Sequence, residues 1–61
     1  MAVSGELIRL INYVDDINTT LRRINASTSD MDGEERHRLA ESLRAASTNM
    51  QEVVVKLEKG A

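Results

Sequence analysis

Two stripes of apolar residues run along the chain with the spacing of packed α-helices. In each stripe the steps alternate between three and four positions, which places the residues on one side of a helix. The first stripe is Val3, Leu7, Leu10, Val14, Ile17, Leu21 and Ile24, and the second is Leu39, Leu43, Ala46, Met50, Val53 and Leu57. The pattern predicts an all-α chain with one helix over about residues 4–27 and another over about 32–59.

The segment between the stripes predicts a turn at residues 28–31. It interrupts the apolar spacing and is rich in Ser, Thr, Asp and Gly, which favour turns and helix caps. Ser4 is expected to cap the first helix, and Asp32 followed by Glu35 has the spacing of a capping box. Gly60 fits the position that ends the second helix.

So short a turn predicts that the two helices run antiparallel as a hairpin. When the stripes are paired, from Leu7 with Leu57 to Ile24 with Leu39, the paired residue numbers total 63 or 64 throughout. This register places the fold-back at the predicted turn. We therefore expect residues 1–61 to form one helical-hairpin domain.

The apolar sector of each helix is wider than a single hairpin seam requires. Ile8 and Ile11 widen the first stripe, and Ala40, Ala45, Val54 and Val55 widen the second. A sector this wide is typical of a helix that contacts two neighbours, and a chain of 61 residues buries little surface alone. We expect two hairpins to form a four-helix bundle in which the stripe residues make the core and the dimer interface.

The arrangement of that assembly is left open by the pattern. A head-to-tail dimer, a parallel dimer and a tetramer all bury the stripes. A second seam through Ala40, Ser47 and Val54 lies beside the one through Leu39, Ala46 and Val53, so the rotation of the second helix is also open.

Composition excludes several classes of site. The chain has no Cys and a single His, His37, so neither a disulfide nor a His/Cys zinc site can form within one chain. No catalytic set or phosphate-binding loop is present, and we expect no enzymatic activity, metal or cofactor. No apolar run approaches a membrane span, and no basic region precedes the first apolar residues, which favours a cytoplasmic protein.

Eight residues are candidates for a binding surface: Arg9, Asn12, Tyr13, Arg22, Arg23, Arg36, His37 and Arg38. Arg22 and Arg23 lie toward the end of the first helix, where cations favour the helix dipole, and a dimer would duplicate them into an anion site. Residues 36–38 form a basic cluster, for which we expect pairing along the helix, as between Glu34 and Arg38. Tyr13 is expected to flank the stripe with its hydroxyl in water.

The run Asp32-Gly33-Glu34-Glu35, with Glu41-Ser42-Leu43 downstream, resembles the turn region of the Rop family of plasmid copy-number regulators. The resemblance implies an antiparallel dimeric four-helix bundle and RNA binding by the outer face of the first helix. Asn12 matches an amide position of that face. Asp16 stands where the family has an exposed aromatic residue, and Asp15 and Asn18 stand at nearby basic positions.

The favoured hypothesis is a non-enzymatic homodimer that binds another protein as a small regulator or adaptor of bacterial or phage type. The alternatives are a Rop-like RNA-binding regulator and a protein that holds a small anionic ligand, such as a nucleotide, between subunits. A net charge of −2 disfavours RNA. A further alternative is that the chain is the oligomerisation segment of a longer protein.

Overall fold

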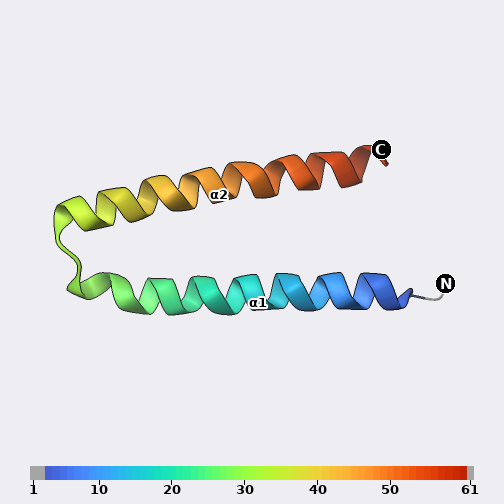
Figure 1. The fold of residues 1–61 in the computed structure, drawn as a ribbon, viewed down its shortest axis with the longest axis horizontal. Coiled ribbons are helices and arrows are strands. Elements are labelled where there is room, and N and C mark those ends of the chain that lie inside the picture. The colour runs from blue at the N-terminus through green and yellow to red at the C-terminus, as the bar shows by residue number, and fades with distance from the viewer. Residues whose placement is uncertain (1–2, 61) are drawn as a thin grey trace. The chain divides into compact units, whose positions relative to one another are not determined.

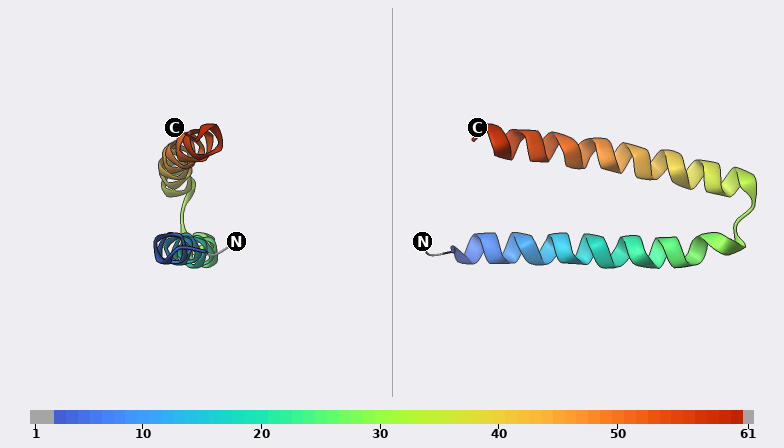
Figure 2. Two further views of the ribbon diagram at one scale, coloured as in Figure 1. Left: turned by 90° about the vertical axis from the view of Figure 1, so that its right-hand side faces the viewer. Right: turned by 180° about the vertical axis from the view of Figure 1, so that it is seen from behind.

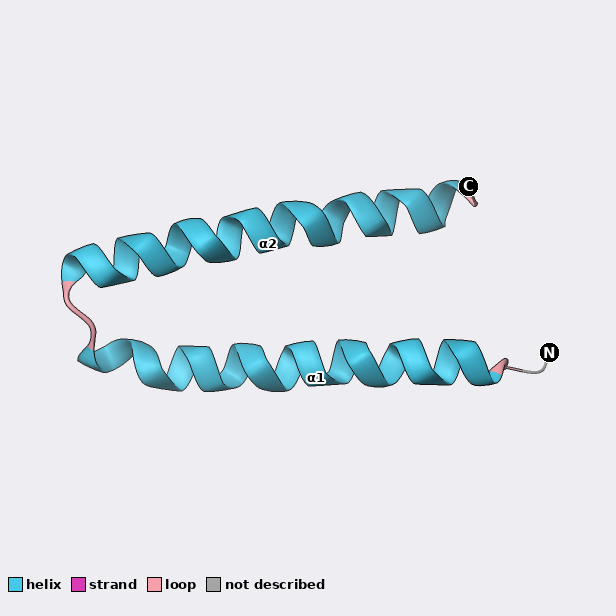
Figure 3. Ribbon diagram, in the orientation of Figure 1, coloured by secondary structure: helices cyan, strands magenta, loops and turns pink. Residues whose placement is uncertain are grey.

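The computed structural model describes residues 3–60, and these form two long α-helices joined by a short turn. Helix α1 spans Gly5–Ser27, the 3-10 helix η1 spans Thr28–Asp30, and α2 spans Gly33–Lys59 (Figure 1). No strand occurs among the described residues, as the colouring by secondary structure shows (Figure 3). The predicted all-α class is confirmed, while the predicted domain limits at Met1 and Ala61 lie outside the described residues.

Helix α1 begins at the residue that the sequence predicted. The Ser4 hydroxyl accepts a hydrogen bond from the Leu7 N–H at 3.0 Å, and the Ile8 N–H donates to the Ser4 carbonyl. The cap therefore satisfies backbone donors that have no partner inside the helix. Glu6 adds negative charge in the first turn, beside the positive end of the helix dipole.

Hydroxyl groups satisfy the carbonyls at the end of α1. Ser27 Oγ donates to the Arg23 carbonyl at 3.0 Å, and Thr28 Oγ1 donates to the Asn25 carbonyl at 2.9 Å. The last turn holds no basic residue. The expectation that Arg22 and Arg23 favour the helix dipole is therefore wrong, because the helix continues to Ser27 and the dipole's effect is confined to its final turn.

A complete capping box begins α2. The Glu35 N–H donates to Asp32 Oδ1 at 2.8 Å, and Glu35 Oε1 accepts in return from the Asp32 N–H at 3.3 Å. The helix ends at Gly60, whose φ of 69° lies in the left-handed region that glycine adopts without strain. Lys56 and Lys59 supply positive charge in its last turn. The capping box and the end of the helix at Gly60 confirm sequence predictions.

Both helices stay continuous in every view, with no break inside either one (Figure 2). Proline is absent from the chain, and the three glycines lie at helix ends. The interiors are thus composed of residues that tolerate or favour the helix. None of the helices within residues 3–60 combines the length and the apolar character that crossing a bilayer requires.

The single chain buries none of its described residues. The predicted core residues of α1 are exposed from Val3 to Leu21, with fractions between 42% and 59%, and in α2 Leu57 reaches 73%. Ile24, Thr28, Met31, Leu39 and Leu43 are half-buried, and all five lie near the turn. Exposed aliphatic side chains of this number are what we expect of helices whose apolar sectors pack against another chain.

Candidate functional site

The candidate binding residues of α1 differ in whether their side chains already have a partner on the same helix. Arg9 Nη2 forms an ion pair with Glu6 Oε1 at 2.6 Å, one turn away on the same helix. Asn12 and Tyr13 form no side-chain hydrogen bond within residues 3–60, and Tyr13 is 53% exposed. Arg9 is therefore partly neutralised, whereas the amide and the ring remain accessible.

Arg22 and Arg23 are basic residues of α1 whose charges are not paired with the acidic residues of that helix. Neither forms a salt bridge within the described part of the chain. Because adjacent helical residues diverge by about 100°, the two guanidinium groups leave the helix in different directions. They offer two separate cationic positions on each chain rather than one clamp.

One face of α1 points away from the apolar stripe. With about 100° per residue, Asn12, Asp16 and Arg23 lie roughly opposite the centre of the stripe formed by Leu7, Leu10, Val14, Ile17 and Leu21. We call Asn12, Asp16 and Arg23 the outer face of α1. It mixes an amide, a carboxylate and a guanidinium, which suits hydrogen-bonded recognition more than burial.

The side chains of the basic cluster of α2, residues 36–38, already contact groups nearby in the chain. Arg38 lies 3.8 Å from Glu34, which agrees with the predicted pairing, and His37 lies 2.5 Å from Glu41. Arg36 Nη1 donates to the Met31 carbonyl at 3.2 Å. All these side chains are well exposed, so the pairs contribute little to stability. Of residues 36–38, Arg36 is the one without an acidic partner within residues 3–60.

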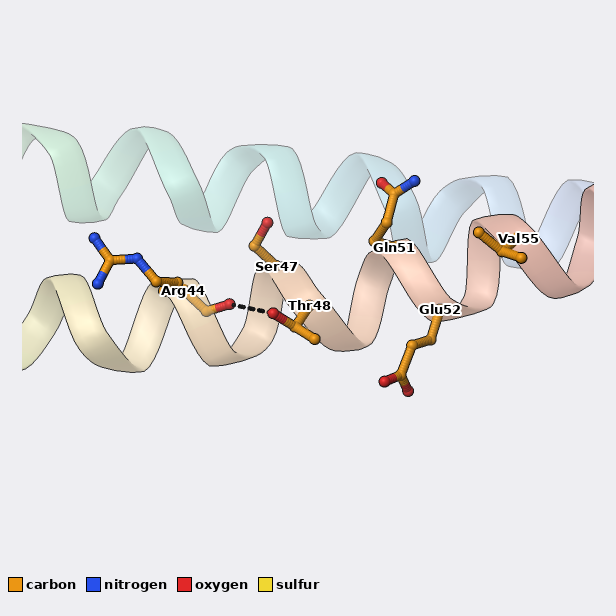
Figure 4. A pocket seen from close by; sticks show the side chains of 6 residues that line it. All are labelled: Arg44, Ser47, Thr48, Gln51, Glu52 and Val55. Atoms are coloured by element: carbon orange, nitrogen blue, oxygen red, sulfur yellow. Dashed lines mark hydrogen bonds between the residues drawn. The ribbon is translucent and has the colours of Figure 1, made fainter.

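A shallow depression lies along α2 and was not predicted from the sequence (Figure 4). Six residues of this one helix line it: Arg44, Ser47, Thr48, Gln51, Glu52 and Val55. Thr48 Oγ1 donates to the Arg44 carbonyl at 3.1 Å, which turns its hydroxyl toward the backbone. The depression is lined by side chains of unequal length, of which Ser47 is the shortest. It is open along its length, so it fits a packed side chain better than an enclosed ligand.

Among residues 3–60, no group of three His, Asp or Glu side chains is placed to hold a metal ion. No side chain within this range has a buried polar atom lacking a hydrogen-bond partner. The chemistry that the structure places on the surface is thus ionic, amide and aliphatic.

Comparison with known proteins gives this chain no relative: no family model matches it, and neither a curated protein nor a solved structure resembles it significantly. What agrees with the Rop-like resemblance is the order of the elements: a helix, a short turn and a second helix.

Proposed function

We propose that this chain is a non-enzymatic interaction protein that works as a homodimer and binds a partner protein. In this proposal α1 and α2 pack as an antiparallel hairpin in the register given by the stripes. Two hairpins bury their stripes in a four-helix bundle. The outer face of α1 then remains on the surface in two copies related by symmetry.

The observation that carries the proposal is the exposure of both apolar stripes in the single chain. Leu10, Val14 and Ile17 are exposed by 42–52%, and Val53 by 55%. Each large aliphatic side chain gains roughly 1.5–3 kcal/mol when it is fully buried. Half-exposed stripes therefore retain much of this free energy for packing of α1 on α2 and of one hairpin on a second copy.

Partner binding is assigned to the outer face of α1 because it carries polar groups with few internal partners. Asn12 forms no side-chain hydrogen bond and Arg23 forms no ion pair within residues 3–60. The bundle would act by occluding or recruiting the partner, and no bond would be made or broken.

The test is affinity capture from native lysate, with and without nuclease, using the wild-type chain and the double variant Asn12→Ala with Arg23→Glu. A partner protein that is retained after nuclease and lost with the variant supports the proposal. The matched control is Lys59→Glu, which makes the same charge change in another helix. Loss of the partner with both variants, or its retention with both, would refute the assignment to this face.

A Rop-like RNA-binding regulator is the second candidate, and the unpaired Arg22 and Arg23 favour it. Lysines and arginines that neutralise phosphates release counterions, so affinity for RNA would fall steeply with salt. Retention of RNA at ~50 mM salt that disappears with Arg22→Ala and Arg23→Ala supports this candidate. No retention at that salt concentration excludes it.

A further inference from the structure

One line of side chains along α2 is symmetric about Ser47. Arg36, Ala40, Ser47, Val54 and Glu58 follow one another in steps of four, seven, seven and four residues. With about 100° per residue these five positions fall within about 40° of one another, on the edge of the apolar stripe. We call them the Ser47 line. Arg36 and Glu58 stand at its two ends, with opposite charges.

We infer that the Ser47 line is the surface through which α2 packs antiparallel against α2 of a second copy. The inference rests on the proposed dimer and specifies its geometry. In this pairing Ser47 faces the same residue of the second copy on the two-fold axis. Ala40 then lies opposite Val54 of the other chain, and Arg36 lies opposite its Glu58. Each contact occurs twice.

Side-chain size fits this pairing. The side chain of Ser47 is small, so the backbones of two α2 helices can approach closely at the centre of the line, and Ser47 also stands at the rim of the shallow depression of α2 (Figure 4). On each side of the centre a small residue, Ala40, would meet a larger one, Val54, which is 39% exposed in the single chain. Alternating small and large residues across an interface lets two helices interdigitate.

The charges of Arg36 and Glu58 favour an antiparallel over a parallel arrangement of the two α2 helices. In an antiparallel pair the Arg36 guanidinium meets a carboxylate at both ends of the line. In a parallel pair, Arg36 would face Arg36 and Glu58 would face Glu58, which is repulsive. Glu58 forms no ion pair within residues 3–60, and Arg36 has only a hydrogen bond to the Met31 carbonyl. Both charged groups are thus available to a second chain.

The opposite edge of the α2 stripe is the competing surface. There Glu35, Ser42, Asn49 and Lys56 also bring opposite charges together in an antiparallel pair. None of these four residues is apolar, and the Glu35 carboxylate already accepts a hydrogen bond in the capping box at the start of the helix. The Ser47 line is favoured because it buries Ala40 and Val54 and leaves that box intact.

Disulfide trapping tests the inference directly, because the chain has no cysteine of its own. Antiparallel helices 8–10 Å apart bring facing Cα atoms to roughly 4–6 Å, within reach of a disulfide. In the inferred geometry Ser47→Cys cross-links to its own copy under mild oxidation. Ala40→Cys and Val54→Cys do not cross-link alone, since each lies about 21 Å from its own copy, but they cross-link when mixed.

The control is an equimolar mixture of Ser42→Cys and Asn49→Cys, which reports the opposite edge. Sedimentation of the reduced proteins measures the oligomeric state. This measurement distinguishes a failure of the Ser47-line geometry from a failure of the proposed dimer. A sedimenting dimer in which Ser47→Cys gives no cross-link, or in which Ala40→Cys cross-links to itself, overturns the inference and leaves the dimer standing. Sedimentation of a folded monomer overturns both.

Discussion

Asp32 and Glu35 hold each other at the start of α2 through two reciprocal hydrogen bonds, at 2.8 and 3.3 Å. The pair satisfies backbone donors on both sides of the helix boundary. Asp32→Ala removes the cap and is expected to lower the free energy of unfolding by about 1 kcal/mol per chain. Urea denaturation followed by circular dichroism measures the loss at fixed protein concentration.

Asp30→Ala is the matched control for the capping box. Asp30 precedes the helix boundary, lies in η1 and makes no hydrogen bond with α2 of the kind that Asp32 makes. The control is expected to change stability by less than about 0.5 kcal/mol. Equal losses of stability from Asp32→Ala and Asp30→Ala would show that the capping box stabilises the protein no more than a negative charge near the start of α2 does.

Much of the fold could be predicted because helix boundaries are local. Ser4, Asp32 and Gly60 act through hydrogen bonds or dihedral angles within a few residues of themselves, so their spacing in the sequence was sufficient. The end of α1 was less well predicted. Its carbonyls are satisfied by the hydroxyls of Ser27 and Thr28, and the composition of this segment favours turns and caps without indicating which carbonyl each hydroxyl contacts.

The candidate site could be predicted only in part. The pairings of Glu34 with Arg38 and of His37 with Glu41 agree with the expected pairing along the helix at a spacing of four, whereas the pairing of Arg9 with Glu6 was not predicted. The depression beside Ser47 depends on the lengths of six neighbouring side chains, which periodicity does not report.

His37 is expected to act as an ordinary surface residue. It contacts Glu41 at 2.5 Å, and the two side chains are 73% and 60% exposed, so water screens the pair. Glu41→Gln is therefore expected to change the free energy of unfolding by no more than about 0.5 kcal/mol. Thermal melts of the wild type and of Glu41→Gln at equal concentration measure the difference. A loss of more than about 2 kcal/mol in the free energy of unfolding would contradict the expectation that His37 is an ordinary surface residue.

Arg36→Glu and Glu58→Arg each place like charges at both ends of the Ser47 line. Each is expected to raise the dimer dissociation constant roughly ten-fold, and the double variant is expected to restore it. Both changes suit the helix dipole locally, since one adds an acid near the start of α2 and the other a base in its last turn. Weaker association would therefore report the contact between chains and not damage to the helix.

Analytical ultracentrifugation of the three variants measures the dissociation constants. Glu52→Arg provides the control, because it makes the same charge change as Glu58→Arg on the side of α2 away from the stripe. Recovery of wild-type affinity in the double variant alone is the expected pattern. Additive weakening in the double variant would contradict the antiparallel pairing of Arg36 with Glu58.

Val14→Asp tests the α1 stripe. Val14 is 52% exposed in the single chain, and the proposed dimer buries it, so a carboxylate there would be taken out of water without a partner. We expect association to weaken by at least about 100-fold. Asn12→Asp makes the same change in charge on the outer face of α1 and is expected to leave association within about two-fold of wild type.

The central claim is that the two apolar stripes are buried by a second copy of the chain, and sedimentation equilibrium at micromolar concentration tests it most directly. The account predicts the mass of a dimer, together with a melting temperature that rises with protein concentration. A cooperatively folded particle with the mass of one chain, 6.8 kDa, and a melting temperature independent of concentration would contradict it.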